Sequence, residues 1–205
     1  MNLIVKPPKF VQRILKSFIW RHNEDNNNIW LTFDDGPDSK VTPFILQILK
    51  NQQIKATFFL VGEQINKYPE ILDMILNDGH IIANHSYSHK NGWFTNSKSY
   101  VNDVEKCQVF MPENNLFRPP YGKITPIQTR TLEKKYKIVL WDVLSYDFSE
   151  KIKPEKIKEN IMKNTTKGSI IVLHNNHKSY NNLKLILHQT IKELKQKGFN
   201  FSTTW

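Results

Sequence analysis

The sequence predicts an α/β fold, a distorted (β/α) barrel of about seven parallel strands, and two observations support it. Short apolar runs alternate with amphipathic stretches along nearly the whole chain, and this alternation is typical of a parallel sheet. Glycines such as Gly79 and Gly198 follow helical stretches and precede apolar runs, as C-terminal helix caps do. Seven strand–helix units are enough to close a barrel.

The individual elements follow from the same patterns. Strands are expected at 29–33, 56–61, 80–84, 115–118, 137–143, 169–174 and 199–203. Helices are expected at 41–50, 69–76, 97–110, 126–136, 154–163 and 183–195. In the first of these helices Ile45, Ile48 and Leu49 recur on one face, which is the pattern of a helix packed on a sheet. Pro69 lies at the start of its helix, where a proline is tolerated.

Length and composition favour a single domain. The chain has 205 residues, of which 39% are hydrophobic, and this is enough for a full core. We divide it into an N-terminal helical extension at 1–28 and one barrel domain at 29–205. No apolar run reaches the roughly 18 residues of a membrane span. Basic residues interrupt the N-terminal apolar run and no small-residue cleavage site follows, so we expect a cytoplasmic protein or one bound peripherally at the inner membrane.

The net charge of +10 does not by itself identify a partner. The lysines are dispersed along the chain and no nucleic-acid-binding motif is present, so we expect no nucleic-acid partner. Cys107 is the only cysteine, which excludes an internal disulfide, and it lies in a helical stretch away from the predicted chemistry. The oligomeric state is left open.

Residues 1–22 combine basic and apolar side chains without an acidic residue. The basic ones are Lys6, Lys9, Arg13, Lys16 and Arg21, and the apolar ones at helical spacing are Phe10, Val11, Ile14, Leu15 and Phe18. A helix of this kind either packs on the barrel, which we favour, or lies on an anionic membrane surface.

Polar residues collect at the C-terminal ends of the predicted strands, where parallel barrels place their chemistry. In chain order they are Asp34 and Asp35, His85 and His89, the segment 118–122, the segment 142–148, and His174.

A metal site is predicted among these residues. His85 and His89 are separated by three residues, so one ion can reach both, and Asp35 supplies a carboxylate from a neighbouring strand end. Two histidines and one carboxylate are a common zinc set in catalytic sites. The adjacent Asp34 need not bind the ion and can take a proton from the attacking water. The alternative is that the histidines cap a turn and the aspartates cap the helix beginning near Val41.

Five ordered motifs now point to a family. The stretches TFDDGPD, HSYSH, RPPYG, DVLSYDF and VLHNN resemble those of the polysaccharide deacetylases, the carbohydrate esterase family built on the NodB homology domain. The resemblance extends from Ile29 to about Phe201 and implies a NodB-like distorted barrel. It also implies a hydrolase that removes acetyl groups from N-acetylated sugars of a polysaccharide or glycolipid, by attack of a water molecule that the metal activates.

The resemblance assigns roles to the metal side of the site. Asp34 would be the general base, and Arg118 would position it. Asp35, His85 and His89 would bind one divalent ion, zinc first, with cobalt, nickel or manganese as alternatives.

The same resemblance assigns the acid side and the substrate pocket. His174 would protonate the leaving amine, Asp147 would hold its imidazolium form, and the backbone N–H of Tyr121 would help to hold the oxyanion. The substrate-binding residues would be Pro120, Tyr121, Phe148 and Leu173.

The fourth motif departs from the family pattern at Leu144 and Phe148, where an aspartate and a tryptophan are usual. These changes affect the substrate pocket more than the chemistry. Two alternatives therefore stay open: a non-catalytic barrel that binds a glycan, and a hydrolase of a non-sugar amide on the same fold.

Overall fold

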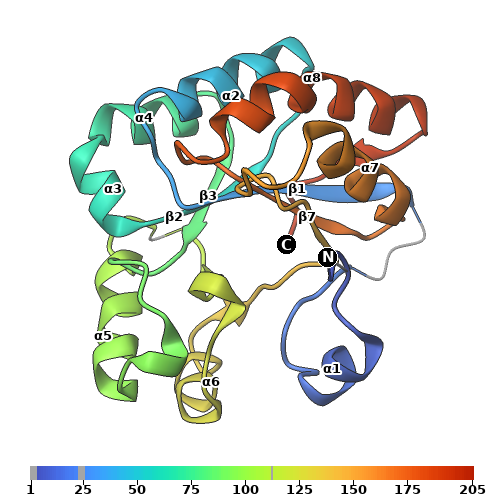
Figure 1. The fold of residues 1–205 in the computed structure, drawn as a ribbon. Helices are drawn as coiled ribbons and strands as arrows, with labels where there is room; N and C mark the ends of the chain where they lie inside the picture. Colours follow the sequence, from blue (N-terminus) through green and yellow to red (C-terminus); the bar gives the residue numbers. More distant parts are fainter. Residues whose placement is uncertain (1–3, 23–25, 112) are drawn as a thin grey trace.

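The computed structural model describes residues 4–22, 26–111 and 113–205 (Figure 1). The strands are β1 (Asn28–Asp34), β2 (Thr57–Leu60), β3 (Ile81–Asn84), β4 (Leu116–Phe117), β5 (Lys137–Ile138), β6 (Val143–Leu144), β7 (Ile170–His174) and β8 (Asn200–Phe201). The α-helices are α1 (Lys9–Ile14), α2 (Val41–Asn51), α3 (Gly62–Lys67), α4 (Pro69–Asn77), α5 (Ser97–Gln108), α6 (Pro126–Leu132), α7 (Pro154–Asn164) and α8 (Tyr180–Gln196). Two 3-10 turns are η1 (Gly92–Phe94) and η2 (Pro120–Gly122).

The strands form one curled parallel sheet, and the predicted fold class is confirmed. The strand order is β5-β4-β3-β2-β1-β7-β6, and β8 pairs with the beginning of β1. Every ladder in this order is parallel. In Figure 1, α2, α4 and α8 lie on one side of the central strands, while α5 and α6 lie at the other side of the curl.

The predicted strand at 137–143 is wrong as a single element. Its two ends form β5 and β6, which occupy opposite ends of the strand order. The residues between them leave one edge of the sheet and reach the other, so they cannot continue one ladder. The ordered strands therefore make a half-barrel, and β5 does not pair with β6 in the described part of the chain.

The helices agree with the prediction to within a few residues, with one omission. The predicted helix at 126–136 ends at Leu132, and the one at 183–195 begins earlier, at Tyr180. Helix α3 was not predicted, because only Gly62 and Ile65 are buried among its six residues and they give no periodic signal. Gly79 and Gly198 have φ angles of 73° and 83°, which confirms the expected left-handed caps.

Strand β1 separates two parts of the core. Its successive side chains point to opposite faces of the sheet. Leu31 and Phe33 pack in a large cluster with the residues of α2 and α8, while Trp30 packs in a smaller cluster with Phe59. Asp34, two positions beyond Thr32 on the Trp30 side, therefore emerges at the C-terminal end of the curl.

Residues 18–22 are part of the barrel core. Phe18 and Trp20 are buried, and they pack with Phe117 and residues of α5 and α6. The backbone N–H of Ile19 donates to the Ile138 carbonyl at 2.8 Å. This segment thus lies beside β5. The division at residue 28 stays a prediction about domain organisation, and residues 1–3 and 23–25 of the extension lie outside the described residues.

Helix α1 is shorter than the predicted N-terminal helix and is covered on one side only. Val11 and Leu15 pack against the cluster that contains Phe18. Phe10 and Ile14, which share the next face of the helix, are 64% and 75% exposed. No described helix has the length and apolar character that crossing a membrane requires.

Candidate functional site

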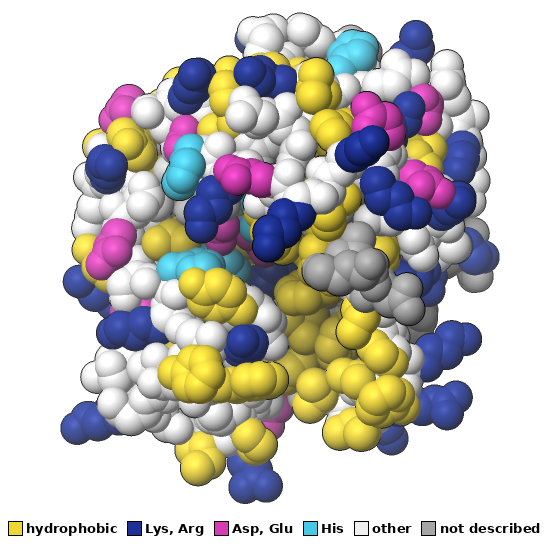
Figure 2. Space-filling view, viewed as in Figure 1, with side chains coloured by type: hydrophobic (Ala, Val, Ile, Leu, Met, Phe, Trp, Pro, Cys, Tyr) yellow, Lys and Arg dark blue, Asp and Glu magenta, His cyan; other side chains and the backbone are white. Residues whose placement is uncertain are grey.

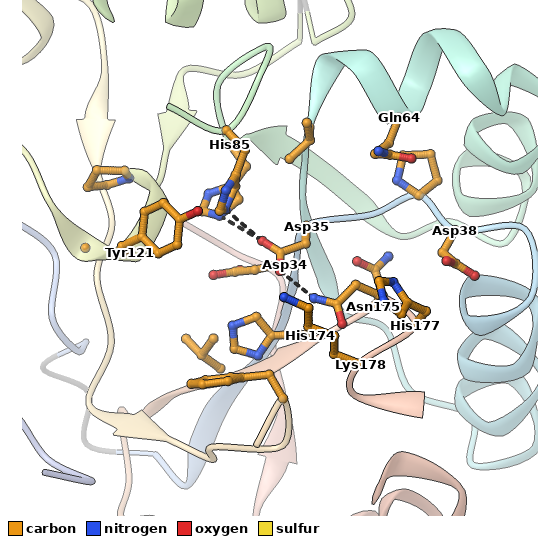
Figure 3. Close-up of a pocket in the computed structure, with 18 of the residues that line it drawn as sticks. Asp34, Asp35, Asp38, Gln64, His85, Tyr121, His174, Asn175, His177 and Lys178 are labelled. Atoms are coloured by element: carbon orange, nitrogen blue, oxygen red, sulfur yellow. Dashed lines mark hydrogen bonds and ion pairs between the residues drawn. The ribbon is translucent and has the colours of Figure 1, made fainter. Parts of the chain in front are cut away.

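A cavity of about 560 Å³ opens at the C-terminal ends of the central strands (Figure 3). The carboxylates of Asp34 and Asp35 come from the end of β1, His85 and His89 follow β3, and His174 ends β7. The register of the parallel ladder brings these ends together, since Asp34 lies beside His174 on the neighbouring strand. The sequence prediction that these rim residues converge is therefore supported by their positions.

Asp35, His85 and His89 form a compact group that could hold a metal ion. One ligand atom from each lies within 4.8 Å of the others. The Nε2 atoms of His85 and His89 lie 3.4 and 3.0 Å from Asp35 Oδ1. Nδ1 of His85 donates to the carbonyl oxygen of Arg118 at 2.7 Å, because a carbonyl can only accept. This bond leaves the lone pair of Nε2 facing the group, as in many metal-ligating histidines.

The environment of Asp35 keeps it anionic. Burial raises the pKa of Asp35, but its close contacts with His85 and His89, together with the charge of His174, outweigh burial and hold this pKa well below its usual value. Nδ2 of Asn176 donates to the other carboxylate oxygen at 2.6 Å. Both oxygens of Asp35 are thus held in place, and Figure 3 shows its carboxylate directed toward His85.

Asp34 is held by a different partner. Nη1 of Arg118 donates to Asp34 Oδ1 at 2.6 Å, and Arg118 is completely buried. The guanidinium also donates to Thr32 Oγ1 at 2.8 Å and to the Leu140 carbonyl at 3.0 Å. It lies over the ring of Phe59, 3.9 Å from the centroid. Burial lowers the pKa of Arg118, whereas the charge of Asp34 opposes this change.

His174 and Asp147 form the third polar group. Nδ1 of His174 lies 2.7 Å from Asp147 Oδ1, and the backbone N–H of His174 donates to Oδ2 at 2.8 Å. Ser145 Oγ donates to Asp147 Oδ1 at 2.8 Å. Burial is the largest single influence and lowers the pKa of His174, but the charge and hydrogen bond of Asp147, with smaller contributions from Asp35 and Asp34, together outweigh burial and raise this pKa to about 9. With this raised pKa, His174 carries a proton at neutral pH.

The apolar wall of the cavity differs in part from the prediction. Phe148 lies in the wall and contacts the His174 ring edge-on, with centroids 4.8 Å apart. The predicted wall residue Leu173 is 1% exposed and packs in the large core cluster. Because strand side chains alternate, His174 faces the cavity with Val172, and Leu173 faces the other side of the sheet. Leu173 therefore does not line this cavity, and its substrate-binding role stays a prediction.

A similar one-residue shift affects the third motif. Pro119 lines the cavity, whereas Pro120 is buried at the turn η2 and does not. Tyr121 lines the cavity, as predicted, and is 60% exposed. Its φ angle of 60° lies in the left-handed region, and no hydrogen-bond partner of its backbone N–H appears in the described part of the chain.

Sequence reasoning missed several supporting residues. Asn175 Oδ1 accepts the backbone N–H of Gly36 at 2.6 Å, so it ties the end of β7 to the loop that carries Asp35. A Cβ at Gly36 would lie 2.1 Å from Nδ2 of Asn175, so this contact requires glycine. Asn176 and Ser145 hold the two acidic partners described above. Asn175 and Asn176 directly follow the predicted strand at 169–174, and this position could have identified them as site residues. No sequence pattern pointed to Ser145.

The backbone of the site is strained. Five non-glycine residues with φ between 54° and 82° lie in the site loops. They are Asp35, Ser86, His89, Tyr121 and Tyr146. Left-handed conformations of such residues cost on the order of 1–3 kcal/mol each and gather at functional sites. Asp35 and His89, two members of the candidate metal group, are among these residues.

Comparisons with known proteins identify relatives of the chain. A family model described as polysaccharide deacetylase matches residues 21–140. A peptidoglycan-N-acetylglucosamine deacetylase of Bacillus cereus is 35% identical over 204 residues, which cover 96% of this chain and 73% of the relative. The peptidoglycan-N-acetylmuramic acid deacetylase PdaC of Bacillus subtilis is 34% identical over 182 residues, covering 85% of this chain and 37% of that protein.

Solved structures agree with these relatives. The crystal structure of a peptidoglycan N-acetylglucosamine deacetylase in complex with 4-naphthalen-1-yl-N-oxidanyl-benzamide superposes with a TM-score of 0.86. Its chain is 34% identical, and the match covers 93% of this chain and 92% of that one.

The pair of His174 and Asp147 generates the first testable prediction. Replacing Asp147 with Asn removes the charge that stabilises the imidazolium, so the pKa of His174 should fall from about 9 to near or below its ordinary value of 6.5. NMR titration of the His174 ring measures this change. Since the pKa is raised in the folded state, the pair's contribution to stability is complete below pH 6.5 and is lost as pH rises through 9.

The matched control is Glu63→Gln, which removes a carboxylate from the same cavity without touching His174. It should leave the pKa of His174 nearly unchanged. An Asp147→Asn protein in which His174 still titrates near 9 would refute the assigned partnership.

Proposed function

The chain belongs to the polysaccharide deacetylase family, and on that premise we propose that its cavity hydrolyses the acetamide group of N-acetylglucosamine units in peptidoglycan or a related glycan. The products are acetate and a free amine on the sugar. The observation that carries the proposal is the divergence of two neighbouring carboxylates, Asp34 to a buried arginine and Asp35 to two histidines. The relatives' substrates support the glycan as the substrate class.

Asp35, His85 and His89 would hold one divalent cation, with zinc as the first candidate. The donor set fits, since two imidazoles and one carboxylate are a common catalytic zinc set that leaves positions open for water and substrate. The hydrogen bonds that orient these residues also fit a metal site, because His85 donates to the Arg118 carbonyl and Asp35 accepts from Asn176. When bound, such an ion acts as a Lewis acid and lowers the pKa of water to about 7.

Asp34 would act as the general base. Arg118 binds one of its oxygens and fixes the orientation of the carboxylate, so the other oxygen can take a proton from the attacking water. Arg118 does not line the cavity and would act only by positioning Asp34. The adjacent Asp35 cannot take this role, because both of its oxygens already have partners.

The Tyr121 N–H would donate to the oxygen of the tetrahedral intermediate. Its left-handed conformation sets the peptide at the cavity rim, and the donor is not used within the described fold. Fixed backbone donors of this kind typically contribute about 2.7–4 kcal/mol to transition-state stabilisation.

His174 would complete the reaction as the general acid. Asp147 keeps its imidazole protonated at neutral pH, and Nε2 is free to face the substrate because Nδ1 is bonded. Transfer of that proton to the amide nitrogen allows the C–N bond to break and the amine to leave. Val172, Leu144 and Phe148 form an apolar surface beside it that suits the acetyl methyl.

The roles of the two aspartates can be separated by mutation. Asp34→Asn should retain the metal and lose about 10²–10⁴-fold in kcat, because the base alone is missing. Asp35→Asn should also weaken metal binding, since it alters a ligand. Elemental analysis and acetate release from N-acetylglucosamine oligomers, peptidoglycan and a lipid-linked sugar measure both effects.

The alternatives predict different results in the same assays. A hydrolase of non-sugar amides would bind metal but release acetate from none of the three substrates. A barrel that binds glycans without turnover would bind the oligomers and release no acetate, with or without bound metal. Equal metal loss in Asp34→Asn and Asp35→Asn would contradict the division of roles.

We also propose that α1 contacts an anionic membrane surface. Phe10 and Ile14 are exposed, while Lys9 and Arg13 lie on the same short helix. Exposed apolar groups beside basic ones are typical of interfacial helices. The segment before α1 contacts a residue that lines the cavity, because the Val5 carbonyl accepts the N–H of Leu144. A membrane contact would thus place the cavity near lipid-linked sugars, and the location at an inner membrane stays a prediction.

Sedimentation with vesicles tests this contact. The intact chain should sediment with phosphatidylcholine vesicles that contain phosphatidylglycerol, and less so as salt rises. The double variant Phe10→Ala/Ile14→Ala should lose sedimentation while its Tm hardly changes, because both side chains are exposed. Val109→Ala, at a position 78% exposed directly after the end of α5, is the control. Sedimentation that persists in the double variant would remove α1 from the contact.

A further inference from the structure

Three large aromatic side chains are exposed on the turn η1 and on the nearby segment 121–123, which packs against Gly92. Trp93 is 61% exposed, Phe94 is 84% exposed and Tyr121 is 60% exposed. Most other aromatic rings of the described chain are buried or half-buried. We call Trp93, Phe94 and Tyr121 the aromatic ledge.

The ledge is continuous with the cavity. The ring of Tyr121 meets that of His89 edge-on, with centroids 4.7 Å apart, so one end of the ledge touches a proposed metal ligand. Lys123, two residues later, lies over Trp93 at 5.0 Å and over Phe94 at 5.9 Å from the ring centroids. Figure 2 shows hydrophobic side chains with basic ones among them around the central hollow of this face.

The loop that carries Trp93 and Phe94 is firmly anchored. Nε2 of the buried Gln128 donates to the carbonyls of Gly92 and Thr95, at 2.9 and 3.1 Å. Asn91 Oδ1 accepts the N–H of Trp93 at 3.0 Å. The two exposed rings thus lie on a turn that hydrogen bonds hold at both ends. Because the turn is already ordered, the protein loses less conformational entropy when a ligand binds to the rings.

The chemistry of the ledge fits a glycan. The C–H face of a pyranose ring is apolar and covers an aromatic ring, while its hydroxyls stay at the edge and in water. Lys123 offers three N–H donors beside the rings for hydroxyl or carboxylate oxygens. A protein partner would more often require a larger apolar surface than three rings around a lysine.

We propose that the aromatic ledge binds sugar units of the glycan that lie outside the cavity, next to the unit being deacetylated. This inference rests on the proposed function, because the cavity must hold one N-acetylated sugar for the ledge to hold its neighbours. The ledge makes the protein selective for oligomers over single sugars. Its contribution falls on substrate binding and not on the chemical step.

Chain-length kinetics test the ledge. In Trp93→Ala and Phe94→Ala, KM for an N-acetylglucosamine pentamer should rise about tenfold, the change expected from losing 1–2 kcal/mol of apolar contact. The kcat for the pentamer and all constants for the dimer should change little, because neither side chain reaches the cavity. Ile127→Ala, at a position 64% exposed on α6, is the matched control and should behave as the unchanged protein.

A binding measurement separates failure of the ledge from failure of the proposed function. Isothermal titration of the pentamer into Asp34→Asn, with and without Trp93→Ala, requires no turnover. Weaker binding after Trp93→Ala would support the ledge even if no acetate is released by the unchanged protein. Equal affinity in the two proteins, or equal KM changes for dimer and pentamer, would overturn the ledge. A ledge that instead joined two copies of the chain would show concentration-dependent dimers that Phe94→Ala abolishes, with unaltered pentamer affinity.

Discussion

The buried ion pair between Arg118 and Asp34 is the interaction on which the rest of the site depends. The guanidinium of Arg118 donates to Thr32 on β1 and to the carbonyl of Leu140, which lies between β5 and β6. The backbone carbonyl of Arg118 accepts the hydrogen bond that orients His85. Arg118 therefore connects Asp34, the sheet and the group formed by Asp35, His85 and His89. A lone buried charge on either partner would cost about 3–5 kcal/mol, so each partner requires the other. This explains why the fully buried cation is an arginine, whose planar fork can serve several acceptors at once.

The two adjacent aspartates can do different work because the strand ends between them. Asp34 still follows the alternation of β1, whereas Asp35 has a φ angle of 82° and leaves it. Asp tolerates this conformation better than most residues. The turn directs one carboxylate to the buried Arg118 and the other to His85 and His89. Close packing of Asn175 against Gly36 then holds the turned loop against the end of β7.

Much of this arrangement could be predicted from the sequence, and the rest could not for identifiable reasons. Rim residues such as His85 and His174 were located because strand ends in a parallel sheet meet at one edge. Val172 lines the cavity where Leu173 was predicted, because side chains alternate along a strand and a one-residue error places a side chain on the opposite face. The division of 137–143 into β5 and β6 has no local signal, because no glycine or proline interrupts the run and only tertiary pairing decides which edge each half joins. The aromatic ledge also depends on a tertiary contact, that of Gln128 with Gly92.

The most direct test is a crystal structure of the zinc-loaded protein with anomalous data at the zinc edge. The account predicts one strong peak about 2.0–2.2 Å from Asp35 Oδ1 and from Nε2 of His85 and His89. Asp34 should stay outside the coordination sphere and keep its bond to Arg118. A peak at another position, or Asp34 as a zinc ligand with Arg118 displaced, would contradict the separation of metal ligand and base.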